Sequence, residues 1–165
     1  MIAAFAYIAA MVAANLSVAH FGPSVSPINA FLFIGLDLSL RDYLHESWKG
    51  RALWPKMGAL IAIAGAISYV LNPASGRIAV ASVVAFVVAA VADAAVYHAM
   101  RSRPYLVRSN ASNVAGAAVD SLIFPTLAFG ALLPGIVALQ FVAKVGGGAL
   151  WSVLLRSRLA AQINK

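Results

Sequence analysis

Six long apolar runs alternate with short polar or turn-forming segments along the chain. A helix needs about 20 apolar residues to cross a bilayer, so the runs predict an all-α polytopic membrane protein with six transmembrane helices. One transmembrane domain then covers residues 1–165, with spans at about 2–19, 28–47, 57–71, 78–99, 111–130 and 135–155. The apolar part of the second run is too short to cross, so we expect its helix either to continue through the charged residues 41–46 or to break there.

The segments between the runs contain residues that end helices. Gly22 and Pro23 follow the first run, and Asn72-Pro73 follows the third. Residues 20–27 and 130–134 are therefore expected to be turns. A basic loop containing Arg108 is expected between the fourth and fifth spans, with Pro104 as the helix breaker.

Lys and Arg residues are distributed unevenly among these connections. Ten of the 12 lie in the second and fourth connections and in the C-terminal tail, while Arg77 lies in the third and Lys144 lies within a run. With six spans, the three basic segments share one side of the membrane, and an odd number would scatter them. Since cytoplasmic loops are enriched in Lys and Arg, both termini are expected in the cytoplasm and the chain in the inner membrane.

Composition excludes several other classes of protein. The 165 residues are 62% hydrophobic and 10% charged, whereas soluble domains carry about 25% charged residues. The chain has no cysteine, which excludes disulfides, thiol catalysis and thiolate metal sites. Its net charge of +7 would be compatible with binding to nucleic acid. The basic residues flank apolar runs, however, so a lipid bilayer is the expected partner.

All five acidic residues lie within the expected spans or at their cytoplasmic ends. A charge facing lipid costs at least about 2.5–3.5 kcal/mol, so these side chains should face the interior of the bundle. Asp37, Asp120 and Lys144 each lie about nine residues into a span, which is about 14 Å deep and close to the midplane. The sequence therefore predicts a polar site between the helices.

Helical spacing groups further polar residues with these charges. Asp93 is one and two turns from Tyr97 and Arg101, and Lys144 is one turn from Gln140. The candidate substrate-binding residues are Asp37, Asp93, Asn113, Asp120, Arg41, Tyr97, Arg101, Lys144, Gln140 and Asn15.

Structural roles account equally well for several of these candidates. Asp93–Arg101 and Asp37–Arg41 would then be ion pairs, and Lys144 would neutralise Asp37 or Asp120. Asn15 and Gln140 would form hydrogen bonds between helices. The small residues, including Gly116, Gly146, Gly147 and Gly148, are expected to let helices approach closely.

Motifs for catalysis, cofactors and metals are missing from the sequence. It has no Gly-Lys-Ser/Thr nucleotide loop, no His-Glu-x-x-His and no Gly-x-Ser-x-Gly. The three histidines are far apart in sequence and suggest no metal site. We therefore expect a protein without enzymatic activity, cofactor or bound metal.

Three segments resemble a known family of transporters. Gly35-Leu-Asp-Leu-Ser-Leu-Arg-Asp-Tyr43 is similar to a Gly-Leu-x-x-x-x-Arg-Asp stretch of the queuosine precursor transporters, also called the VUT (vitamin uptake transporter) family. Asp93-Ala-Ala-Val-Tyr97 resembles the acidic helix of that family, and the segment from Ser109 to Phe124 resembles its Ser/Asn-rich approach to a buried Asp. The resemblance extends from Asn15 to about Leu155.

This resemblance implies a six-helix importer of a purine-like base, 7-cyano- or 7-aminomethyl-7-deazaguanine. A carboxylate can accept two parallel hydrogen bonds from the N–H groups of a guanine-type edge, which suits Asp120 or Asp93. A carrier or substrate-binding subunit for another vitamin or nucleobase, a structural membrane protein and an intramembrane enzyme stay open as alternatives. The sequence also leaves open the oligomeric state, the energy coupling and whether the chain needs an energising partner.

Overall fold

The computed structural model describes residues 2–48 and 52–163, apart from some side chains inside helices. Over these residues the chain is helical and contains no strand, which confirms the all-α fold class. The helices α2, η2 (a π-helix) and α3 follow one another without a break and form one continuous rod, which we call the second rod. The helices are α1 (Ile2–Phe21), α2 (Ser26–Asn29), η2 (Ala30–Ile34), α3 (Gly35–Trp48), α4 (Leu53–Leu71), α5 (Gly76–Ala99), α6 (Tyr105–Phe129) and α7 (Pro134–Ile163).

The surface of the bundle is strongly apolar. Phe5 is 70% exposed, Val70 78% and Val153 72%, and many other large aliphatic side chains point outward. Within the described residues, three helical segments are long and apolar enough to cross a membrane: Ile2–Phe21, Pro73–Ala99 and Asn110–Phe129. An exterior of this kind suits a lipid environment, because the apolar side chains would be poorly solvated by water.

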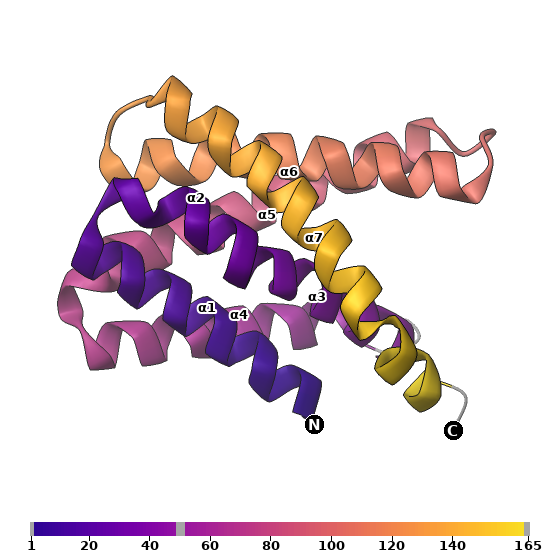
Figure 1. The fold of residues 1–165 in the computed structure, drawn as a ribbon, viewed down its shortest axis with the longest axis horizontal. Coiled ribbons are helices and arrows are strands. Elements are labelled where there is room, and N and C mark those ends of the chain that lie inside the picture. Colours follow the sequence, from indigo (N-terminus) through magenta and orange to yellow (C-terminus); the bar gives the residue numbers. More distant parts are fainter. Residues whose placement is uncertain (1, 49–51, 164–165) are drawn as a thin grey trace.

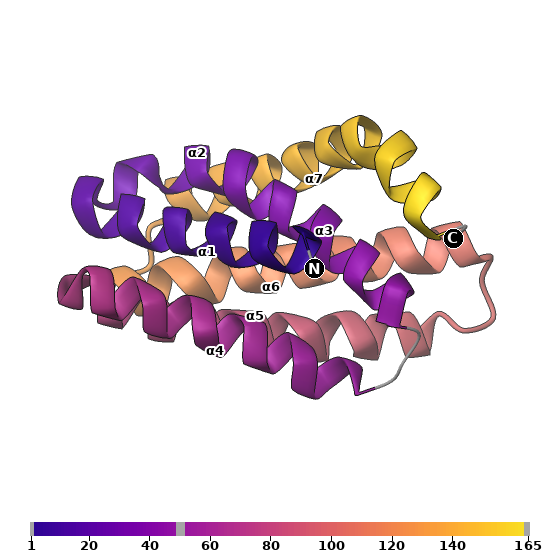
Figure 2. The ribbon, with the colours of Figure 1, turned by 90° about the horizontal axis from the view of Figure 1, so that it is seen from below.

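The rods alternate in direction along the length of the bundle (Figures 1 and 2). The turns after α1, α4 and α6 lie together at one end, which we call the turn end. The end of α3, the start of α4 and the turn between α5 and α6 lie toward the opposite end, which carries Lys56, Arg101 and Arg103 and which we call the basic end. The uneven distribution of basic residues in the sequence thus corresponds to a difference between the two ends of the fold.

Arg77 is the exception at the turn end, and the structure gives it a local role. Its Nε donates a 3.0 Å hydrogen bond to the carbonyl oxygen of Leu127 in the last turn of α6. This helix ends at Gly130, which has a φ of 74°. A cation is favourable where carbonyl groups are left unpaired at the C-terminus of a helix.

Several element boundaries differ from those expected. α6 begins at Tyr105, directly after Pro104, so the backbone of Arg108 is helical and not part of a loop. The expected turn at residues 20–27 is shorter, because α2 begins at Ser26. Proline is well tolerated just before or in the first turn of a helix, so Pro104 and Pro27 start helices instead of delaying them. The second rod continues to Trp48, as one of the two alternatives expected.

Two close approaches fix the helices around the centre of the bundle. α5 packs along α6, and a Cβ added at Gly116 would lie 3.4 Å from Asp93 Cβ. α7 crosses the second rod so closely that a Cβ at Gly35 would lie 2.6 Å from the carbonyl carbon of Gly147, and one at Gly147 would overlap the Phe31 carbonyl group. The expected role of small residues is therefore confirmed at Gly147, whereas a Cβ at Gly116 or Gly146 would meet only ordinary van der Waals contacts.

Candidate functional site

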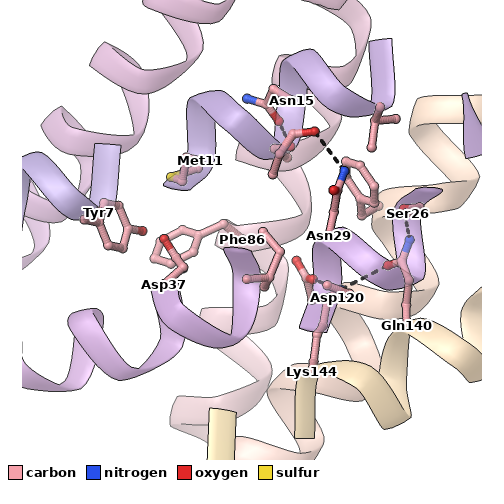
Figure 3. Close-up of a pocket in the computed structure, with 16 residues that line it drawn as sticks. Tyr7, Met11, Asn15, Ser26, Asn29, Asp37, Phe86, Asp120, Gln140 and Lys144 are labelled. Atoms are coloured by element: carbon pink, nitrogen blue, oxygen red, sulfur yellow. Dashed lines mark hydrogen bonds and ion pairs between the residues drawn. The ribbon is translucent and has the colours of Figure 1, made fainter. Parts of the chain in front are cut away.

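Two adjoining cavities lie inside the bundle. The turn-end cavity has a volume of about 70 Å³ and is lined by residues of α1, the second rod, α5, α6 and α7 (Figure 3). The basic-end cavity has a volume of about 50 Å³ and lies further along α5 and α6 toward the basic end. Both cavities are lined by Ile34, Asp37, Phe86, Asp120 and Lys144, so they meet at these side chains.

Most of the residues predicted from the sequence line at least one of these cavities. The turn-end cavity is lined by Asn15, Asp37, Asp120, Gln140 and Lys144. The basic-end cavity adds Asp93 and Asn113.

Two of the predicted residues fall outside this arrangement, and a third is not described. Tyr97 and Arg101 line neither cavity, and Arg101 is exposed in the turn after α5. The side chain of Arg41 lies outside the described residues.

Lys144 forms the central ion pair of the site. Its Nζ contacts Oδ2 of Asp120 across the α6–α7 contact and also donates a 3.2 Å hydrogen bond to Oε1 of Gln140, one turn away on α7. Nε2 of Gln140 in turn donates to Oγ of Ser26 on the second rod. Lys144 is 3% exposed and Gln140 1%, whereas the side chain of Asp120 is 24% exposed, so the ammonium group is buried and the carboxylate only partly so. Of the two partners considered for Lys144, the structure gives Asp120.

Asp37 occupies the opposite wall of the turn-end cavity. It is 6% exposed and lies in the first turn of α3, directly after the π-helix. Figure 3 shows its carboxylate facing the hydroxyl of Tyr7 from α1, with Asp120, Lys144 and Gln140 on the other side. The π-helix changes the angular position of the residues that follow it, and such segments often occur at functional sites.

Asp93 is the third carboxylate that lines the basic-end cavity, after Asp37 and Asp120. Its Oδ1 is buried and has no hydrogen-bond partner among the described residues. Asp93 and Arg101 form no ion pair in the described part of the chain, so the expected structural pairing is not seen. An unused carboxylate oxygen inside a bundle is costly, and a ligand with N–H groups would satisfy it.

Asn15 has a different environment, although it also borders the turn-end cavity. Its Nδ2 donates to Oγ of Ser68 at 3.2 Å, and its Oδ1 accepts from Oγ of Ser82 at 2.9 Å. These bonds join α1 to α4 and α5. The structure therefore supports the interpretation of Asn15 as a hydrogen-bonding residue between helices.

The sequence analysis missed several residues that line the turn-end cavity. Ser26 and Asn29 lie one turn apart on α2, in and just after a segment expected to be a turn. Asn29 accepts from Ser17 Oγ and donates to the Ala14 carbonyl group, each at 3.2 Å. Tyr7 and Phe86 also line the cavity, but the sequence did not mark them as site residues, because aromatic residues are common in apolar spans.

The arrangement is suited to recognising a small planar polar molecule. Carboxylate oxygens accept from N–H groups, Lys144 and Gln140 can donate to carbonyl oxygens, and Phe86 and Phe124 contribute apolar wall. The described residues contain no group of three or more His, Asp or Glu side chains that could hold a metal ion.

Comparisons with known proteins give one match. A family model described as a putative vitamin uptake transporter matches residues 1–155, which is nearly the whole chain. No curated protein and no solved structure matches the chain.

Proposed function

The chain belongs to the vitamin uptake transporter family, and on that premise we propose that it imports a 7-deazaguanine base, 7-cyano- or 7-aminomethyl-7-deazaguanine, across the inner membrane. The observation that carries the proposal is the ion pair between the buried Lys144 and the half-buried Asp120, which faces Asp37 across a cavity inside an apolar bundle. Intramembrane charges are expensive and characteristically mark substrate pathways.

The proposed topology has six spans with both termini in the cytoplasm. Lys56, Arg101 and Arg103 gather at the basic end, which the positive-inside rule places on the cytoplasmic side. The turn end carries Arg77, which is bonded to the last turn of α6. The substrate would therefore enter from the turn end and leave at the basic end.

The two walls of the turn-end cavity would contact different parts of the substrate. Asp37 would accept the adjacent N–H groups of the guanine-type edge, because a carboxylate can take two parallel hydrogen bonds. Gln140 and Lys144 would donate to the carbonyl oxygen of the base. Phe86 would contact the face of the ring.

A carrier for another vitamin or nucleobase is the second candidate. The name of the matching family favours it, because that name specifies vitamin uptake and no particular substrate. The same cavity would serve any small planar molecule with adjacent N–H donors and a carbonyl group.

Uptake of radiolabelled 7-deazaguanine bases tests the proposal in cells that cannot make or import them. Cells expressing the protein should accumulate the label, and cells expressing Asp37→Asn at the same level should accumulate far less. Excess unlabelled 7-deazaguanine should compete, whereas adenine should not, because it lacks the N–H donor pair and carbonyl group. Accumulation of another vitamin, with none of the deazaguanine, would favour the second candidate.

A further inference from the structure

The two cavities are arranged in series along the bundle. The turn-end cavity extends from Ser26 near the turn end to Asp37, and the basic-end cavity extends from Asp37 to Asn113 near the start of α6. Their shared lining includes both members of the Lys144–Asp120 ion pair. A molecule that moves from one cavity to the other must therefore pass this pair.

The basic-end cavity has polar groups of its own for a ligand. Asp93 presents a buried Oδ1 without a partner among the described residues, and Asn113 lies on the same wall formed by α5 and α6. Gly116 faces Asp93 from α6, where a Cβ would lie in contact with Asp93 Cβ at 3.4 Å. The chemistry again suits N–H donors of a small planar molecule, which would satisfy the free carboxylate oxygen.

Lys144 has a second hydrogen-bond partner besides Asp120. Lys144 already donates to Gln140 Oε1 at 3.2 Å, and Gln140 lies one turn closer to the turn end on α7. If a ligand N–H group replaced the lysine at Asp120, Lys144 could stay bonded to Gln140 and keep a partner. The hydrogen bond to Gln140 would keep the ammonium group solvated by a polar atom, and the ligand would have to offset the loss of attraction between the two separated charges.

From these contacts we propose that the two cavities are successive binding stations for the substrate and that the Lys144–Asp120 ion pair closes the passage between them. This inference rests on the transport function proposed above. The substrate binds first in the turn-end cavity, displaces Lys144 from Asp120 and then passes to Asp93 and Asn113. The ion pair thus keeps the two stations separate when no substrate is bound.

Thiol labelling tests the closed passage directly, because the chain contains no cysteine. Single cysteines at Ala30 and Ala117 would report on the turn-end and basic-end cavities, which these residues line. Cysteines at Ser24 and Ser102, exposed at opposite ends, would show which face of a vesicle the reagent reaches. The reagent is a charged methanethiosulfonate that does not cross bilayers.

In the otherwise native chain, reagent added at the turn end should label Ala30→Cys and leave Ala117→Cys unlabelled. The double substitution Asp120→Asn/Lys144→Gln removes the ion pair without leaving a lone buried charge. It should raise labelling of Ala117→Cys from the turn end at least about tenfold, because the charge-assisted bond that holds the two walls together is lost. Lys144→Arg keeps the pair and should keep the passage closed.

Two results would overturn the inference: Ala117→Cys labelled equally from the turn end with and without the ion pair, or Ala117→Cys unlabelled from either face in both backgrounds. If the double variant fails to fold, the single substitution Lys144→Gln replaces it under the same criteria. The labelling uses no substrate, so its outcome is independent of the uptake assay. Absence of deazaguanine uptake with the expected labelling would reject the proposed substrate and leave the passage intact.

Discussion

The bundle contains two groups of buried polar side chains with contrasting composition. The Asn15 cluster consists of Asn15, Ser68 and Ser82, which are neutral and join α1, α4 and α5. The Lys144 cluster consists of Lys144, Asp120, Gln140 and Ser26, and it places two charges between α6, α7 and the second rod. Both border the same cavity, but the two clusters differ in what their burial costs.

Neutral hydrogen bonds inside a membrane bundle are inexpensive and join helices, whereas buried charges carry a large desolvation cost. In the Asn15 cluster both the amide nitrogen and the amide oxygen of Asn15 have partners. In the charged region an oxygen of the neighbouring Asp93 has none among the described residues. The contrast favours a structural role for the Asn15 cluster. Ligand binding by the charged region, which comprises the Lys144 cluster together with Asp37 and Asp93, is part of the function proposed above.

The largest expected effect comes from Lys144→Met. Removing one partner of a fully buried ion pair costs about 3–5 kcal/mol, and because the Asp120 side chain left behind is 24% exposed, we expect the lower end of this range and a fall in the thermal unfolding temperature of the purified protein. Uptake should also be abolished, because the variant lacks the ammonium group that donates to the substrate and the ion pair that closes the passage between the cavities. Asp120→Asn/Lys144→Met should recover much of the stability without recovering uptake, and recovery of both would show the pair to be structural.

Asp93→Asn should separate function from folding. Oδ1 of Asp93 has no hydrogen-bond partner to lose, so the unfolding temperature should stay close to that of the native chain. Uptake should fall about ten- to hundredfold, because one charge-assisted hydrogen bond to the substrate is worth about 1.5–3 kcal/mol. Normal uptake kinetics in this variant would remove Asp93 from the substrate pathway.

Asn15→Ala should give the opposite pattern. Losing the bonds to Ser68 and Ser82 should lower stability by about 1–2 kcal/mol, measured as a shift of thermal unfolding in detergent. Uptake per folded molecule should change little. A variant that folds as stably as the native chain but no longer transports would place Asn15 in the substrate site. The two clusters would then not differ in function.

Arg101→Gln should have the smallest effect. Arg101 is exposed at the basic end and borders neither cavity, so uptake should stay within about twofold, which corresponds to less than 0.5 kcal/mol. Initial rates of uptake at matched expression would measure this. A large loss would show that the pathway extends beyond Asp93 to the end of α5.

Much of this arrangement could be predicted from the sequence, because apolar runs and intramembrane charges are strong local signals. The midplane depth of Asp37, Asp120 and Lys144 followed from helical rise, and the structure brings all three to the junction of the two cavities. Charges in lipid must find polar surroundings, so their inward placement is dictated by energetics.

The rest depends on information that a local pattern does not contain. Helical spacing put Tyr97 and Arg101 on a stripe with Asp93, yet only Asp93 of the three lines a cavity, and Arg101 lies in the turn after α5 ends at Ala99. The π-helix η2, which precedes Asp37, has no sequence signature that periodicity could detect. The choice of Asp120 over Asp37 as the partner of Lys144 depends on which helices meet, and α6 meets α7 through tertiary packing.

Equilibrium binding of radiolabelled 7-cyano-7-deazaguanine to the purified protein tests the central claim most directly. The native chain and Asn15→Ala should both bind with similar affinity, and Asp37→Asn should lose at least about tenfold in affinity, as expected for one charge-assisted hydrogen bond. Equal binding by the native chain and Asp37→Asn, or loss of binding in Asn15→Ala alone, would contradict the assignment of the charged region to substrate recognition.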